Sequence, residues 1–201
     1  MKVVIVDYGA GNLPSVERAL RGLGAETERA TEPAQVGAAK AIVLPGVGHF
    51  SAFVNGLRER NLTSSLREAY HSGVPILGIC LGLQAMFASS EEAPGAPGLG
   101  FFPDEVRALP ADVKSPHIGW NQLRRTRASA LLQGIPEDAY FYFAHSYAAP
   151  ASSESTVAAC DHGFAFAAVI EQRSLGAVQF HPEKSGEAGA RVLGNFLESV
   201  Q

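Results

Sequence analysis

One stretch near the middle of the chain, residues 74–87, limits the possible folds more than any other part of the sequence. Its apolar run Ile76–Ile79 is short and follows a proline, which is typical of a buried strand. Beyond this run the apolar residues take the i, i+3, i+4 spacing of one helical face. The residues with this spacing are Leu83, Met86 and Phe87. The stretch therefore predicts a buried strand that turns sharply at Cys80 into a helix.

Cys80 lies at the tip of that predicted turn, between Gly78 and Gly82. Neither glycine has a Cβ atom, so the backbone can make the tight strand-to-helix turn known as a nucleophile elbow. An isolated cysteine is most often a small buried apolar residue. The pattern Gly-x-Cys-x-Gly-x-Gln after a strand favours a nucleophile instead, because a helix N-terminus and a nearby imidazolium promote formation of the reactive thiolate.

The composition is that of a globular protein, and we expect a single domain over residues 1–201. The net charge of -4 and the lack of a basic run argue against a nucleic-acid partner. Apolar segments are too short for a membrane span or a signal peptide, so we expect a cytoplasmic protein in which Cys80 and Cys160 stay reduced. We expect no cofactor and no metal site, because His49, His71 and His162 lack ligand spacing.

The first half of the chain alternates short apolar runs with helical patterns, as parallel strands joined by helices do. Strands are predicted at Val3–Val6 and Ala41–Leu44, and helices at Ser15–Leu23, Phe50–Leu57 and Leu62–Tyr70. Gly9-x-Gly11 matches half of a dinucleotide fingerprint, but the third glycine is missing, so nucleotide binding is not predicted.

A glycine-rich turn, Pro45-Gly46-Val47-Gly48, follows the strand at 41–44. The backbone N–H groups of such a turn face the cleft in which open α/β sheets bind ligands. Gly46, Val47 and Gly48 are therefore a candidate oxyanion hole, and a plain tight turn is the alternative.

The second half of the chain has a different pattern, made of shorter and more β-like pieces. Strands are predicted at residues 105–109, 118–123, 140–144, 156–159, 167–170 and 176–180, and a closing helix at 187–200. We therefore expect an α/β fold with an open mixed, mostly parallel sheet flanked by helices and with a strand-rich second half.

The last predicted strand leads into His181-Pro182-Glu183. A cysteine nucleophile needs a base within reach, and that imidazole needs an acceptor to fix its tautomer. His181 and Glu183 are two residues apart in an extended strand, so they would lie on the same side. Such a pair alone is more often a surface pair, but with the elbow it predicts a Cys80, His181 and Glu183 triad.

The segments Gly78–Gln84 and His181–Glu183 together resemble the class I glutamine amidotransferase family, whose members hydrolyse glutamine and pass ammonia to a synthase. Further segments are similar to the glutaminase subunits of imidazole glycerol phosphate synthase, from histidine biosynthesis. They are Asp7–Leu13, Pro45–Gly48, Pro116–Asn121, His145–Tyr147, His181–Ser185 and Gly194–Phe196. Only Ala88–Ala93 departs, where that family commonly has Glu-Ser-Ser-Glu-Glu-Gly. The resemblance implies a flavodoxin-like fold.

The resemblance also implies roles for individual residues. Cys80 would attack glutamine, His181 would transfer protons and Glu183 would orient His181. The oxyanion would be met by the N–H of Leu81 and by one from the turn at 46–48, where Val47 would have to turn inward. The residues implied to hold glutamine are Gly82, Gln84, Ser146 and Tyr147.

The implied partner is a (β/α)8 barrel synthase subunit that uses the ammonia to make imidazole glycerol phosphate and aminoimidazole carboxamide ribonucleotide. Positions that match the partner interface are Asn12, Trp120, Asn121, Lys184 and Ser185. Two alternatives stay open: the glutaminase of another amidotransferase, in vitamin B6 or anthranilate synthesis, and a cysteine hydrolase that acts without a partner.

Overall fold

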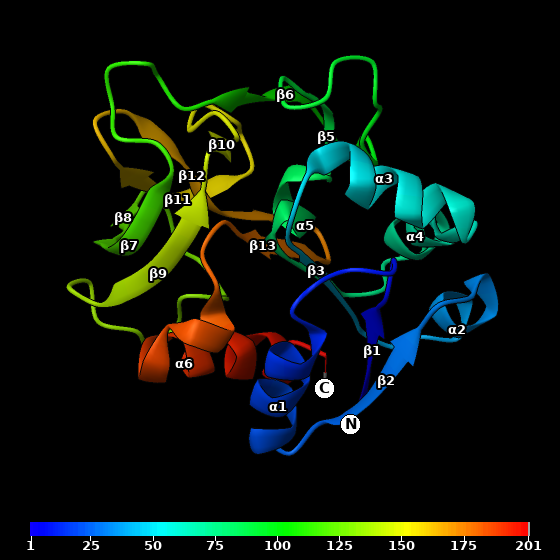
Figure 1. Cartoon of the computed structure of the whole chain (residues 1–201). Helices are drawn as coiled ribbons and strands as arrows, with labels where there is room; N and C mark the ends of the chain where they lie inside the picture. The colour runs from blue at the N-terminus through cyan, green and yellow to red at the C-terminus, as the bar shows by residue number, and fades with distance from the viewer. Residues whose placement is uncertain (201) are drawn as a thin grey trace.

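The computed structural model describes residues 1–200, and its centre is an eight-stranded sheet (Figure 1). The strand order is β2-β1-β3-β4-β13-β12-β11-β8. The first five are parallel and the last three antiparallel. Their bounds are β2 Glu26–Ala30, β1 Lys2–Val6, β3 Ile42–Gly46, β4 Ile76–Cys80, β13 Leu175–Val178, β12 Ala165–Gln172, β11 Thr156–Asp161 and β8 Arg124–Arg125. The expected mixed, mostly parallel sheet is confirmed.

Helices cover both faces of this sheet, which is why β1 is apolar at consecutive positions. Val3 and Ile5 face α1 (Leu13–Gly22) and α6 (Gly186–Glu198), which lie side by side. Val4 and Val6 belong to the core on the other face, with α2 (Pro33–Gly37), α3 (Phe50–Glu59) and α4 (Leu62–His71). None of the helices in residues 1–200 is long and apolar enough to cross a membrane.

The strand-rich second half adds two small sheets, which lie over the end of the main sheet that carries Cys80 (Figure 1). One contains β10 (Tyr147–Ala148), β6 (Phe102–Ala108) and β5 (Phe87–Ser90). The other is an antiparallel ribbon of β7 (His117–Gln122) and β9 (Tyr140–His145), in which His117 pairs with His145. The short helices α5 (Leu81–Gln84) and η1 (Pro182–Lys184) complete the fold.

The predicted helix after Cys80 is wrong in its length, and the strand β2 was not predicted. The helix after Cys80 ends at Gln84, and Phe87 begins β5. Met86 and Phe87 are fully buried, and a short buried run looks the same in a helix and in a strand. The edge strand β2, with the sequence Glu-Thr-Glu-Arg-Ala, was not predicted because it has no apolar alternation.

Candidate active site

Cys80 is the last residue of β4 and stands immediately before α5. Its φ of 54° lies in the left-handed region, which is strained for a side chain with a Cβ atom. The turn is possible because Gly82 packs directly on β3: a Cβ at this position would lie 1.9 Å from the carbonyl oxygen of Leu44. Likewise, a Cβ on Gly46 would lie 2.6 Å from the backbone nitrogen of Gly82. The sharp turn predicted from the sequence is therefore present.

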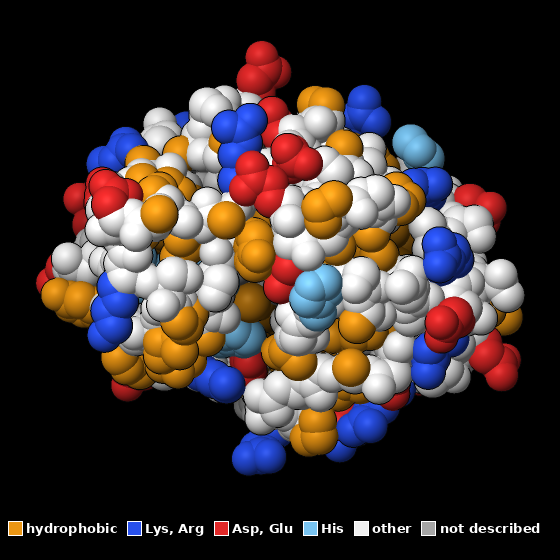
Figure 2. Space-filling model, turned by 45° about the horizontal axis from the view of Figure 1, so that its top comes forward, with side chains coloured by type: hydrophobic (Ala, Val, Ile, Leu, Met, Phe, Trp, Pro, Cys, Tyr) orange, Lys and Arg blue, Asp and Glu red, His pale blue; other side chains and the backbone are white. Residues whose placement is uncertain are grey.

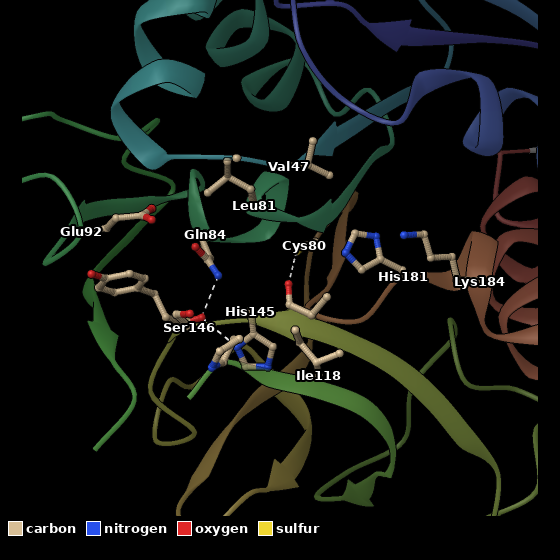
Figure 3. A pocket seen from close by; sticks show the side chains of 14 residues that line it. Val47, Cys80, Leu81, Gln84, Glu92, Ile118, His145, Ser146, His181 and Lys184 are labelled. Atoms are coloured by element: carbon tan, nitrogen blue, oxygen red, sulfur yellow. Dashed lines mark hydrogen bonds between the residues drawn. The ribbon is translucent and has the colours of Figure 1, made fainter. Parts of the chain in front are cut away.

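Cys80 lines a cavity of about 330 Å³ between two walls (Figure 3). We call one the elbow wall: Val47, Gly48, Cys80, Leu81, Gln84, His181 and Lys184. We call the other the strand wall: Pro116, Ile118, Ala144, His145, Ser146 and Tyr147. In Figure 2 the molecular surface is hollowed between two raised parts, with hydrophobic side chains on both sides.

His181, on the elbow wall, contacts Glu183. The Nδ1 atom of His181 lies 2.9 Å from Oε1 of Glu183, and the two side chains are 5% and 1% exposed. The sequence suggested that both residues lie in an extended strand, and this is wrong. Strand β13 ends at Val178, and Pro182 begins the turn η1. Proline fixes φ near the helical value, so the turn, and not strand alternation, brings the acid back to the imidazole.

The pKa of His181 is raised to about 10. Burial alone would lower it, but the side chains of Cys80 and Glu183, through hydrogen bonding and charge, outweigh burial. His181 is therefore protonated at neutral pH beside the Cys80 sulfur. An imidazolium backed by a carboxylate is suited to stabilise a thiolate and then to donate its proton to a leaving group.

Val47 and Gly48 of the predicted oxyanion turn line the cavity, but the N–H of Val47 is bonded to Tyr8 and is not free to meet a ligand. The N–H of Val47 donates to the hydroxyl of Tyr8 at 3.1 Å, and that hydroxyl donates to the carbonyl of Val47 at 3.0 Å. Gly48 follows with a φ of 93°, a conformation that glycine adopts at little cost. Leu81 is the first residue of α5, so its N–H has no acceptor within the helix.

Gln84 lies on the elbow wall and bridges to the strand wall. Its Nε2 donates to the carbonyl of Tyr147 at 2.8 Å and to Oε1 of Gln179 at 3.1 Å. Both amide hydrogens are therefore used within the chain, which leaves its Oε1 as the atom able to accept from a ligand. Ser146 and Tyr147, which are predicted to hold glutamine, line the cavity, whereas Gly82 packs against Leu44 and does not line it.

Comparison with known proteins identifies the family. A family model described as glutamine amidotransferase class-I matches residues 4–200. The chain belongs to this family.

Curated relatives narrow the assignment. An imidazole glycerol phosphate synthase subunit HisH of Moorella thermoacetica is 46% identical over 99% of this chain and 95% of its own length. Another, of Methanothermobacter thermautotrophicus, is 47% identical over 99% of both chains. The amidotransferase thus falls within the HisH group. A solved structure described as glutamine amidotransferase covers 98% of both chains with a TM-score of 0.79 at 20% identity, which supports the fold.

His145 of the strand wall forms a hydrogen-bonded pair with His117, which does not line the cavity. Nδ1 of His145 lies 2.9 Å from the carbonyl of Tyr147, and Nε2 of His145 lies 3.1 Å from Nδ1 of His117. Burial lowers the pKa of His145 to about 3 and that of His117 to about 4, so both are neutral at pH 7. Since a carbonyl only accepts, His145 carries its proton on Nδ1, and His117 must then donate from its own Nδ1.

The predicted partner-interface residues of the amidotransferase do not all reach its surface. Trp120 is 55% exposed on the β7–β9 ribbon, beside Tyr142. Lys184 is exposed and lies 5.7 Å above the ring of Tyr142. Asn12 is half-buried at the start of α1, and the half-buried Asn121 donates to the carbonyl of Asp161.

The side chain of Ser185 is buried. The hydroxyl donates to the carbonyl of His181 at 2.7 Å and accepts the N–H of Tyr142 at 2.9 Å. Its role in the structure is to join η1 to β9, and its place in the partner interface stays a prediction.

Four residues of the site were missed from the sequence: Tyr8, Glu92, His117 and Gln179. Glu92 lines the cavity, and its carboxylate accepts the N–H of Phe50 at 2.8 Å. Tyr8, His117 and Gln179 occur in or next to motifs that the sequence did single out. Their contacts, however, join segments 39, 28 and 99 residues apart, and no local pattern reveals these.

Proposed function

We propose that this amidotransferase is the glutaminase subunit of an imidazole glycerol phosphate synthase, and that Cys80, His181 and Glu183 are its catalytic triad. The observation that carries the proposal is the protonated, carboxylate-backed His181 on the same cavity wall as Cys80. At about 330 Å³ the cavity is of the size that binds a small molecule.

In the first half of the reaction, the Cys80 thiolate attacks the carboxamide carbon of glutamine. The C–N bond breaks as His181 gives its proton to the departing nitrogen, which leaves as ammonia, and a thioester forms. In the second half, neutral His181 takes a proton from water, whose oxygen attacks the thioester. Glutamate is released, and the Cys80 and His181 pair is restored. Glu183 holds the imidazole ring through Nδ1 in both halves.

The negative oxygen formed in each half needs backbone donors. We assign this role to the N–H of Leu81 and to one N–H from the turn at 46–48, which must leave Tyr8 and face the cavity. A single donor of this kind typically contributes about 10²- to 10³-fold to turnover. Because Tyr8 holds Val47 in the structure, the chain alone should hydrolyse glutamine slowly.

The partner in this proposal is a (β/α)8 barrel synthase that receives the ammonia and makes imidazole glycerol phosphate and aminoimidazole carboxamide ribonucleotide. The exposed apolar side chains of the β7–β9 ribbon support a docking surface next to the cavity. They are Ile118, Trp120 and Tyr140, which are 63%, 55% and 54% exposed.

The deciding experiment uses the chain in complex with its synthase subunit. Cys80→Ala should abolish synthesis driven by glutamine and preserve synthesis driven by added ammonium salt. Cys160→Ala is the matched control: Cys160 is buried in β11, away from the cavity, and both activities should survive. Loss of both activities in Cys80→Ala would contradict the proposed division between the subunits.

A second measurement tests the partner. The glutaminase rate of the chain alone is compared with the rate after addition of the synthase subunit and its nucleotide substrate. We expect an increase of orders of magnitude, and equal rates would exclude control by the partner.

A further inference from the structure

Gln179 is a buried polar residue for which the mechanism above has no role. It follows β13 directly and is fully buried. Its backbone N–H donates to the carbonyl of Ala168, which continues the pairing with β12. Its side-chain Nε2 lies 3.6 Å from Sγ of Cys80. A fully buried amide that contacts a reactive sulfur calls for an explanation.

The hydrogen-bond network determines which end of this amide faces the sulfur. The carbonyl of Tyr147 only accepts, so it receives an N–H from Gln84 and another from His145. The second N–H of Gln84 then points at Gln179 and requires the oxygen of that amide. The nitrogen of Gln179 is consequently the end that faces Sγ.

The sulfur has a second neutral neighbour of opposite character. The carbonyl of Ala144 lies 3.9 Å from Sγ and accepts from the uncharged thiol. When the thiol is deprotonated, this carbonyl loses its donor, whereas the N–H of Gln179 gains a charged acceptor. Hydrogen bonds to charged acceptors are the stronger kind, so the contact favours the thiolate.

Several titratable groups surround the sulfur. His181, backed by Glu183, is the charged neighbour, and the buried hydroxyl of Tyr8 approaches from the end of β1. On the opposite side lies neutral His145. Glu92 and Lys184 line the same cavity. Of these groups His181 supplies positive charge at the sulfur, and Gln179 adds an uncharged donor that does not titrate.

We propose that Gln179 is a further catalytic residue, whose side-chain N–H donates to the Cys80 thiolate, and that Gln84 is a positioning residue that fixes the direction of this amide. The inference rests on the proposed role of Cys80 as the nucleophile. It assigns Gln84 a function beyond contact with glutamine.

The test measures the rate at which iodoacetamide alkylates Cys80 in the full chain as a function of pH, with the modified peptide quantified by mass spectrometry. Alkylation requires no glutamine turnover, so the result is independent of the glutaminase assay on Cys80→Ala. Gln179→Met keeps the length of the side chain and removes the donor, and should raise the pH of half-maximal alkylation by about one unit. Gln179→Glu should raise it further, because a carboxylate opposes the thiolate.

Gln133→Met, at an exposed position, is the control and should leave the profile of the unmodified chain unchanged. The proposal is overturned if folded Gln179→Met keeps the wild-type profile, or if Met and Glu shift it equally, which would indicate a packing defect. If circular dichroism shows that Gln179→Met is unfolded, the same alkylation profile is measured on Gln84→Met, and this variant then tests the proposal. It releases the Gln179 amide and should also raise the half-maximal pH, and an unchanged profile would overturn the proposal.

Discussion

The two walls of the cavity contain buried histidines with opposite properties. On the elbow wall His181 is 4% exposed and has a pKa of about 10; on the strand wall His145 is 6% exposed and has a pKa of about 3. Burial lowers the pKa of both. The difference is that His181 has Glu183 and Cys80 beside it, whereas His145 has the Tyr147 carbonyl and neutral His117. The charge of the neighbours, and not the degree of burial, decides the protonation state.

The largest expected effect comes from removing the carboxylate that distinguishes the two walls. Glu183→Gln should lower turnover by about 10³- to 10⁴-fold and leave KM for glutamine nearly unchanged, because the imidazole loses both its orientation and its charge partner. Steady-state kinetics of the complex with its synthase subunit measures both constants. Glu187→Gln, at an exposed position four residues on, should have no effect. A rise in KM alone would show that Glu183 binds substrate.

The second prediction concerns the free energy of unfolding in acid, which should depend on His145 of the strand wall. The pKa of His145 is lowered from 6.5 to about 3, so between these values the unfolded chain binds a proton that the folded chain does not. The contribution of His145 to the free energy of unfolding is therefore fully present above pH 6.5 and is lost as the pH falls. At pH 4.5 the loss from this group is about 3 kcal/mol. Urea unfolding at pH 7 and pH 4.5 measures it.

His145→Asn is the variant for this measurement, because its amide can still donate to the Tyr147 carbonyl and does not titrate. Its stability should depend less on pH across this range than that of the wild type, and an equal dependence would contradict the assignment of a neutral His145. His181 has the opposite sign: its raised pKa gives stability that is present below pH 6.5 and is lost as the pH rises through about 10.

The third prediction concerns the contact between Tyr8 and Val47 of the elbow wall. Tyr8→Phe removes the hydroxyl that holds the Val47 peptide and keeps the ring, which packs 4.3 Å from the ring of Phe53. Loss of two ordinary hydrogen bonds corresponds to about a tenfold rise in the glutaminase rate of the chain alone. The rate in the complex should change little. An unchanged or lower rate of the chain alone would rule out Tyr8 as the group that holds the turn.

The smallest expected effect lies at the outer side of the strand wall. His162 stacks on His117 with ring centroids 4.0 Å apart, and burial together with this neighbouring imidazole lowers the pKa of His117 to about 4. His162→Ala should raise the pKa of His117 by less than about one unit, because burial is the larger cause. A titration followed by NMR would detect the change. A larger rise would mean that the histidine stack, and not burial, keeps His117 neutral.

The elbow wall could largely be predicted from the sequence, since its signals are local. Gly78, Cys80 and Gly82 predict the turn, and the helix boundary failed only where Met86 and Phe87 are buried in either conformation. The resemblance added the family, which the comparisons confirm, whereas the role of each triad residue stays a prediction.

The strand wall could not be predicted in the same way. His117 and His145 are brought together by the register of β7 and β9, and that register depends on cross-strand packing. In the sequence, Gln179 is one polar residue at the end of an apolar strand. Its role becomes visible only from its contacts with Gln84 and Cys80 in the structure. The burial of Ser185 could not be predicted for the same reason, because a small polar residue gives no local sign of whether it faces solvent or joins two segments.

The close packing of Gly82 on the Leu44 carbonyl limits how this pocket can be redesigned. No side chain can be introduced at position 82 without separating α5 from β3. Gly82 therefore cannot be replaced when the pocket is redesigned. Engineering toward bulkier amides has to work from the opposite side, where Ile118 and Ala144 border the cavity.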